Sequence, residues 1–244
     1  MTDLDALLDR MRADLARLTD ARRFFHGTYL RTTEAVGAEI DRGGFADGGW
    51  VLRWDIAFAR LYLDALEADE GGGAVPAPWR VAFTAARERP DLPPLTHVLL
   101  GLNAHINYDL PQALLAVIPA ADMADPAVRA RREADHRHVD TVLRARVGTE
   151  ELELGAVSAV TRLDRLLRPA NRAASRRLLA ESRAKVWRNA RALDAARTAG
   201  PKAYAARLAE LERRCEARVR DLTAPGPVLL NLARRGFGVL LAEA

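Results

Sequence analysis

Residues 101–111 read GLNAHINYDLP, and the residues on both sides of this stretch are apolar. Five hydrogen-bonding side chains lie within it, namely Asn103, His105, Asn107, Tyr108 and Asp109. Polar groups that are removed from water cost free energy unless they find partners. At helical spacing, His105 and Asp109 share one face, and the two asparagines share nearly the opposite face. The stretch therefore predicts a helix that crosses the interior of the protein and carries a buried polar site.

The rest of the chain has the composition and periodicity of a helical protein. Aromatic residues make up only 6% of the 244 residues, while Ala, Leu and Arg are abundant, which favours helices over strands. Apolar periodicity predicts an N-terminal helix within residues 1–20 and further helices at about 22–40, 50–66, 79–87, 98–109, 126–146, 152–167, 171–199 and 202–222. Pro111 should end or kink the polar helix just after Asp109. We expect an all-α, single-domain bundle of seven to nine helices, with an apolar C-terminal tail, residues 223–244, packed on the core.

Charge and hydropathy exclude several classes of partner. The net charge is +4 and the isoelectric point is about 9.7, but acidic residues are interspersed among the arginines, as is typical of solvated helix faces. We therefore expect no nucleic-acid binding. No apolar segment approaches the roughly 20 residues of a membrane span, and the N-terminus lacks the apolar region of a signal peptide. We expect a cytoplasmic protein without a membrane partner, and its single cysteine, Cys215, excludes an internal disulfide.

Four sequence features together resemble a known family. They are the motif Gly101-x-Asn103-Ala-His105-Ile-Asn107-Tyr-Asp109-Leu, the upstream segment from Asp55 to Tyr62, the segment from Asp135 to Leu143, and the pair Arg183 and Trp187. The chain resembles the domain-of-unknown-function family 5995 of bacterial proteins from about residue 24 to residue 193. The resemblance implies a shared helical fold and a shared polar centre, and it implies no reaction. Where the resemblance leads us to expect an asparagine, this chain has Asp140, which adds a negative charge if that position faces the site.

A metal site is one interpretation of the polar helix. His105 and Asp109 lie one turn apart and could present a nitrogen and an oxygen to one divalent ion. Candidates for the remaining ligands are Asp55, Asp135 and one of His136 and His138. On this interpretation the protein is a metal-dependent enzyme, and one divalent metal ion is its candidate cofactor.

Acid–base chemistry without a metal is a second interpretation. Burial lowers the pKa of a histidine and a neighbouring carboxylate raises it, so that together they can prepare His105 for proton transfer. The catalytic residues would then be His105, Asp109, Asp55 and Tyr108. The residues expected to bind a small-molecule substrate are Asn103, Asn107, Tyr29, Tyr62, Arg183 and Trp187.

A structural hydrogen-bond network is the alternative to both. His105 could donate to a buried carboxylate such as Asp55, and the amides of Asn103 and Asn107 could tie helices together. The chain would then be a non-catalytic binding protein or a scaffold. We favour an enzyme, a hydrolase or a lyase that acts on a small molecule, because the polar residues supply both acid–base and ligand-binding groups.

Overall fold

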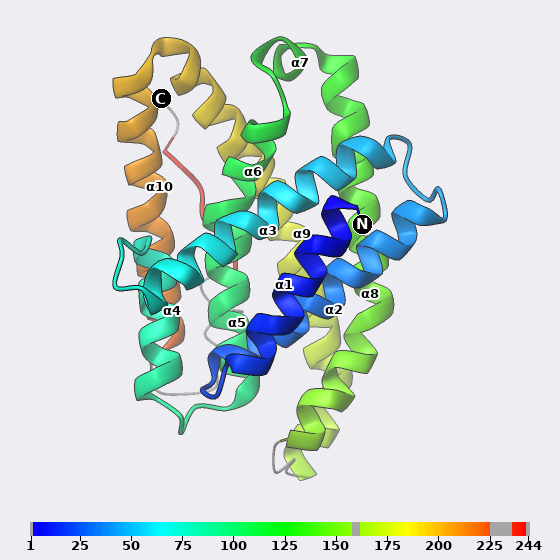
Figure 1. Cartoon of the computed structure of the whole chain (residues 1–244), viewed down its shortest axis with the longest axis vertical. Helices are drawn as coiled ribbons and strands as arrows, with labels where there is room; N and C mark the ends of the chain where they lie inside the picture. Colours follow the sequence, from blue (N-terminus) through cyan, green and yellow to red (C-terminus); the bar gives the residue numbers. More distant parts are fainter. Residues whose placement is uncertain (1, 158–161, 225–235, 243–244) are drawn as a thin grey trace.

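The chain is a bundle of helices (Figure 1). The computed structural model describes all residues except 1, 158–161, 225–235 and 243–244, and for residues 144–157 and 162–180 it describes the backbone alone. Within these ranges the elements are α1 (Asp3–Arg17), α2 (Arg22–Asp41), α3 (Gly48–Glu70), α4 (Ala77–Glu88), α5 (Pro94–Ala104), the π-helical turn η1 (His105–Asp109), α6 (Leu110–Val117), α7 (Ala120–Ala124), α8 (Pro126–Val157), α9 (Arg162–Ala199) and α10 (Pro201–Leu222). Because α5, η1 and α6 form one continuous helix, the described chain has nine helices, and the predicted all-α fold is confirmed.

Local sequence explains where the helices begin. The Thr2 hydroxyl accepts from the Asp5 amide, and the Asp5 carboxylate accepts from the Thr2 amide, so that the two residues form a capping box for α1. Asp47 caps α3 by accepting from the backbone of Trp50 at 2.9 Å. The turn between α9 and α10 requires glycine because φ of Gly200 is 122°. Capping and turn residues therefore help to place the ends of α1 to α4 within a few residues of the predicted ones.

The helix formed by α5, η1 and α6 is the centre of the bundle. It runs behind α3 and beside α10 in Figure 1, and η1 also packs against α9. All five residues of η1 are buried. Side chains of α2, α3, α4, α9 and α10 therefore surround the polar stretch, as a helix through the interior requires.

Pro111 does not end this helix, but the regular α-helical hydrogen bonding changes just before it, where the sequence predicts an end or a kink. The Leu110 amide donates to the carbonyl of His105, five residues earlier, so the turn before the proline is π-helical. A proline ring normally collides with the carbonyl four residues before it. One additional residue in the turn gives the ring room, and the helix continues to Val117.

The second half of the chain differs from the prediction in its boundaries. The expected helices at 152–167 and 171–199 are replaced by a longer α8 and by an α9 that runs from Arg162 to Ala199 without a break, and the short α7 was not predicted. In the C-terminal tail, residues 236–242 are extended and lie against α9 and α10, with Phe237, Val239 and Leu241 buried. No helix among the described residues is long and apolar enough to cross a membrane.

Candidate functional site

A histidine, a carboxylate and an indole form a chain of hydrogen bonds in the core. Nδ1 of His105 lies 2.8 Å from Oδ2 of Asp109, and the indole of Trp79 donates to the same oxygen at 2.8 Å. His105 and Asp109 come from η1, and Trp79 comes from α4. Their exposed fractions are only 2%, 1% and 0%, so the three groups interact in a medium of low dielectric constant, where such bonds are strong. The predicted pairing of His105 with Asp109 across one helical turn is present in the structure.

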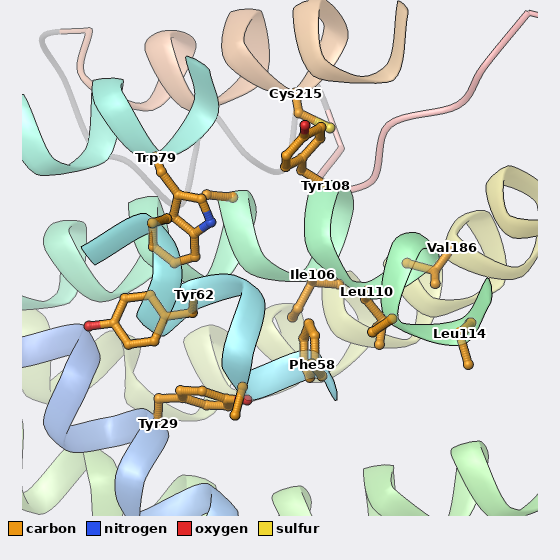
Figure 2. Packing of buried hydrophobic residues seen from close by; sticks show 14 of the residues in the cluster. Tyr29, Phe58, Tyr62, Trp79, Ile106, Tyr108, Leu110, Leu114, Val186 and Cys215 are labelled. Atoms are coloured by element: carbon orange, nitrogen blue, oxygen red, sulfur yellow. The ribbon is translucent and has the colours of Figure 1, made fainter. Parts of the chain in front are cut away.

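Five aromatic rings surround His105, and we call them the aromatic cage. Phe58 stacks on the imidazole with ring centres 3.5 Å apart, and Tyr29 meets it edge to face at 4.5 Å. The remaining rings, at 5.9 to 6.0 Å, are Phe25, Tyr62 and Trp79. Figure 2 shows Tyr29, Phe58, Tyr62 and Trp79 reaching this region from α2, α3 and α4. The cage holds the imidazole plane in place and separates it from bulk water.

Close packing of the cage depends on a glycine in α5. A Cβ atom at Gly101 would lie only 2.3 Å from Cγ of Phe25, closer than any side chain can approach. Gly101 therefore allows the Phe25 ring to lie directly against the backbone of α5. The first glycine of the GLNAHINYDLP stretch thus serves the packing around His105.

Nε2 of His105, the hydroxyl of Tyr29 and Oδ2 of Asp55 are buried and have no hydrogen-bond partner among the described residues, and the same is true of Oδ1 of Asn103 and Nε2 of His136. Burial, and then the charge of Asp55, raises the pKa of the Tyr29 hydroxyl. A buried polar atom without a partner costs about 1–3 kcal/mol. Such atoms need an explanation, and a ligand is a common one.

Burial sets the protonation of the pair formed by His105 and Asp109. It lowers the pKa of His105 and raises the pKa of Asp109, so the pair favours a state without net charge. The pair then holds two protons, one between Nδ1 and Oδ2 and one on Nε2 of His105. Nε2 is therefore a hydrogen-bond donor in the neutral pair, and it becomes an acceptor when one proton is lost.

Asp55 is the second carboxylic acid of the cage. Burial raises its pKa from 3.8 to about 7, which lies within the range in which an acid–base group is useful at neutral pH. Its exposed fraction is 4%, and it lies on α3 between Trp54 and Phe58. Asp55 precedes Phe58 by three positions, so it lies on the face of α3 that carries the ring stacked on His105.

Asn103 and Asn107 lie on the other side of the central helix. Both donate from Nδ2 to the carbonyl of Phe237, at 3.2 and 3.0 Å, and Oδ1 of Asn107 accepts from the Val239 amide at 3.3 Å. The prediction that the asparagines face nearly opposite to His105 and Asp109 agrees with these contacts. Their donor groups bind the C-terminal tail, so the structure does not place them toward the imidazole as substrate ligands.

Tyr108, predicted as catalytic, also points away from His105. Figure 2 shows its ring beside Cys215 of α10, whereas Ile106 points toward Phe58. In the wider π turn, a residue three positions later does not return to the same face of the helix, so Tyr108 and His105 face in different directions. Tyr108 therefore packs in the core between η1 and α10.

Asp135 does not join His105 and Asp109, which corrects its assignment as a metal ligand. Its two carboxylate oxygens accept from the backbone amides of Ala46 and Asp47, at 2.8 and 3.0 Å. The carboxylate thus closes the loop before α3, because these amides would otherwise lack a partner. No group of three or more His, Cys, Asp or Glu side chains that could hold a metal ion occurs in the described part of the chain.

Arg183 and Trp187, predicted to bind substrate, gather around a second buried histidine. The Trp187 indole donates to Nδ1 of His136 at 2.8 Å, and Arg183 donates to the His136 carbonyl at 3.1 Å and pairs with Asp140 at 2.5 Å. Burial lowers the pKa of His136, which keeps the imidazole neutral. The negative charge of Asp140 is therefore used to neutralise Arg183. These side chains join α8 to α9, and their bonds are made to His136 and Asp140.

Tyr62 has a partner of its own. Its hydroxyl lies 2.8 Å from Nδ1 of His26, whose Nε2 lies 2.7 Å from the Met11 carbonyl, so these groups link α1, α2 and α3. Its ring belongs to the aromatic cage, as described above. Tyr62 therefore contributes its ring to the surroundings of His105, while its hydroxyl serves the packing of helices.

A small pocket lies on the outer side of the cage. Phe25, Tyr62 and Trp79 form its inner wall, and Arg22 and His97 are among its outer residues. Its free volume is about 10 Å³, which fits about one water molecule. The pocket therefore ends one ring away from His105 and is separated from it by the cage.

Sequence reasoning missed Trp79, Phe58 and Phe25 as neighbours of His105. Their spacing predicts only buried helix faces, and a buried ring against apolar side chains has the same pattern as a ring against an imidazole. The indole nitrogen of Trp79 offers a weak signal, because a buried tryptophan needs an acceptor. Nothing in the spacing says that the acceptor is Asp109, thirty positions along the chain.

Comparison with known proteins yields one match. A family model described as "Family of unknown function (DUF5995)" matches residues 2–225. No curated protein and no solved structure matches the chain. The matched region contains every residue of the aromatic cage, and it ends before the extended tail at residues 236–242.

Proposed function

The chain belongs to the DUF5995 family, whose function is unknown, and we propose from its geometry that it is an enzyme acting on a small polar molecule. The observation that carries the proposal is the buried Nε2 of His105, which has no partner among the described residues although Asp109 fixes the opposite ring nitrogen. A carboxylate that orients one nitrogen of an imidazole leaves the other ready for proton transfer. The reaction is an acid–base step of a lyase or a hydrolase.

In this mechanism His105 exchanges protons with the substrate through Nε2. In the neutral pair Nε2 carries a hydrogen and donates it to a basic atom of the substrate. The remaining negative charge is held by Asp109, which the Trp79 indole stabilises by donating to Oδ2. The same nitrogen then accepts a proton and restores the pair. Asp109 and Trp79 orient and stabilise the imidazole, and His105 is the catalytic residue.

Tyr29 and Asp55 are the proposed substrate-binding groups. The Tyr29 hydroxyl and Oδ2 of Asp55 are buried without a partner among the described residues, and Asp55 with a pKa of about 7 is present in both protonation states at neutral pH. A small substrate with both donor and acceptor groups fits this set. Phe25 and Tyr62 line the small pocket and also contact His105, so movement of these rings would admit the substrate.

The test is a comparison of the wild type with His105→Phe. Phenylalanine keeps a ring stacked on Phe58 and leaves the Trp79 bond to Asp109 in place, but it removes both imidazole nitrogens. Each purified protein is incubated with an extract of bacterial metabolites, and the small molecules are followed over time by mass spectrometry. We expect at least one substrate to decrease and one product to increase with the wild type alone.

Circular dichroism and the melting temperature establish that the variant is folded. The Leu7→Ala variant, changed in α1 outside the cage, serves as a control and should turn over the same compound as the wild type. The proposal is wrong if the folded His105→Phe protein produces the same change, or if the wild type changes no compound in the extract.

A scaffold is the second candidate, because the bonds among His105, Asp109 and Trp79 tie α4 to the central helix. The full burial of all three groups favours this reading. A scaffold predicts that the polar groups of the cage all contribute to stability. The melting temperatures of variants at Tyr29 and Asp55 therefore distinguish the two candidates without knowledge of a substrate.

A further inference from the structure

Residues 236–242 form an extended segment that we call the strap. Three asparagine side chains bind its backbone. Phe237 is held by Asn103 and Asn107, as described above, and Asn189 of α9 donates to the Val239 carbonyl and accepts from the Leu241 amide, both at 2.9 Å. A primary amide has one acceptor and two donors, so it can pair with a peptide backbone as a neighbouring strand does. The groove between η1, α9 and α10 therefore binds an extended peptide through hydrogen bonds to its backbone.

Charged side chains form hydrogen bonds with four further backbone groups of the strap. Arg218 donates to the Gly236 carbonyl, Lys185 donates to the Gly238 carbonyl at 3.3 Å, and Arg207 donates to the Ala242 carbonyl. Glu210 accepts from the Ala242 amide at 3.3 Å. Backbone bonds together with buried side chains at alternate positions are the features by which proteins recognise extended peptides.

The side chains of the strap alternate as in a bound peptide. Phe237, Val239 and Leu241 have exposed fractions of 2%, 6% and 7%. A Cβ at Gly238 would lie 2.5 Å from Cδ of Lys185 and 3.1 Å from Cα of Ser182 in α9. A side chain at this position would therefore force Lys185 to move and would press on the backbone of α9, which favours glycine between the phenylalanine and the valine.

The strap is connected to the His105 pair through a single helical turn. Asn103 lies just before η1 and Asn107 lies within it, and their donors converge on the one carbonyl of Phe237. His105 and Asp109 span the same turn on its other side, with Nδ1 and Oδ2 2.8 Å apart. A π turn is rare and needs external support. The Phe237 carbonyl supplies that support from the side opposite the imidazole.

We propose that the strap is a peptide ligand bound in cis, and that its docking holds η1 in the form that brings His105 and Asp109 together. Asn103 and Asn107 are positioning residues on this view. The ligand class of the groove is an extended peptide with an aromatic residue, a glycine and a β-branched residue in succession. The inference concerns the assembly of the pair, and it holds whether or not the pair performs catalysis.

The first test displaces the strap without altering the central helix. In the full chain, Gly238→Ala places a methyl group against α9. The readouts are the ¹H–¹⁵N signals of the proton shared by His105 and Asp109 and of the Trp79 indole, with the Trp187 indole, bound to His136, as an internal reference. We expect the first two signals to shift or to be lost and the Trp187 signal to stay. Leu7→Ala in α1, adjusted in temperature to the same fraction folded, should leave all three signals unchanged.

The second test restores the strap in trans. A synthetic peptide with the sequence of residues 236–244, GFGVLLAEA, is titrated into the Gly238→Ala protein. We expect the signals of the shared proton and of Trp79 to return with saturation, and the same peptide with alanine at the position of Gly238 should have no effect. If Gly238→Ala lowers the melting temperature but keeps both signals, the strap only adds stability and the proposal is overturned. Failure of the matching peptide to restore lost signals overturns the assignment of the groove as a peptide site.

Discussion

The two faces of the central helix have the same spacing of polar residues but different hydrogen-bond partners. On one face, the donors of Asn103 and Asn107 find an acceptor in the strap, and Asn107 also binds the Val239 amide. On the other face, His105 and Asp109 bind each other, but Nε2 of His105 has no partner in the described structure, and atoms of Tyr29 and Asp55 have none either. On the asparagine face the strap binds both amide nitrogens and Oδ1 of Asn107, and Oδ1 of Asn103 has no partner among the described residues. The histidine face leaves more of its polar atoms without a partner.

The difference separates a structural polar cluster from a candidate functional one. Folding alone selects buried polar groups whose hydrogen bonds are made, as for the nitrogen and the oxygen of the Asn107 amide. A group that stays unpaired costs stability, and proteins keep such groups where function uses them. Burial is nearly complete on both faces, so exposure does not distinguish them. Substitution of a single polar group therefore shows whether that group lowers or raises the free energy of unfolding.

The largest expected effect is the pH dependence caused by Asp55. Burial raises its pKa from 3.8 to about 7, so the folded protein binds a proton that the unfolded chain has already released between these values. The stability from this group is complete below about pH 4 and is lost as the pH rises to about 7. Asp55→Asn does not ionise. The free energy of unfolding of the variant relative to the wild type should increase by about 3 kcal/mol from pH 5 to pH 8, as measured by denaturant titration.

Other titrating groups are common to both proteins and cancel in this difference. Burial, for example, lowers the pKa values of His105 and His136. Acidification therefore reduces their contribution to the free energy of unfolding equally in the wild type and in the variant. An equal pH dependence in the two proteins would show that Asp55 has a partner in solution. The histidine face would then be as well satisfied as the asparagine face.

The second largest effect is expected on the asparagine face of the central helix. Asn107→Ala removes a donor to the Phe237 carbonyl and leaves the buried Val239 amide without its acceptor. We expect a loss of about 2 kcal/mol in the free energy of unfolding, since an unpaired buried amide costs more than the bond contributes. Asn189→Ala is the matched control, because it makes the same pair of backbone bonds from α9 and should lose a similar amount. A loss below about 0.5 kcal/mol at Asn107, as at surface positions, contradicts the prediction.

Much of the fold followed from the sequence because helical periodicity is a local signal. Capping residues such as Thr2 and Asp47 act within one turn, and the structure uses both of them. The π turn was not predicted, because it depends on the fit between Pro111 and the packing of η1 against three other helices. The continuity of α9 through residues 168–170 was also missed, since a proline next to a polar stretch resembles a helix boundary.

The candidate site was only half predictable. The pairing of His105 with Asp109 and the opposite orientation of the asparagines follow from spacing within one helix. The partners contributed by other helices do not, because a sequence lists potential ligands without their distances. Asp135 and Arg183 were assigned to the site on their chemistry. In the structure, Asp135 accepts from a backbone amide of the loop before α3, and Arg183 pairs with Asp140 of α8. Trp79 was overlooked because its acceptor lies on another helix.

The smallest expected effect gives the sharpest comparison, because two tyrosines of the aromatic cage differ only in their partners. The Tyr29 hydroxyl has none among the described residues, whereas the Tyr62 hydroxyl binds His26 at 2.8 Å. Tyr29→Phe should therefore raise the free energy of unfolding by about 1 kcal/mol, and Tyr62→Phe should lower it by about the same amount. Both values come from denaturant unfolding at pH 7. If both substitutions destabilise the protein, the Tyr29 hydroxyl contributes to folding and the histidine face is structural. Opposite signs instead identify Tyr29 as a group kept at a cost in stability, which a scaffold has no reason to retain and a binding site does.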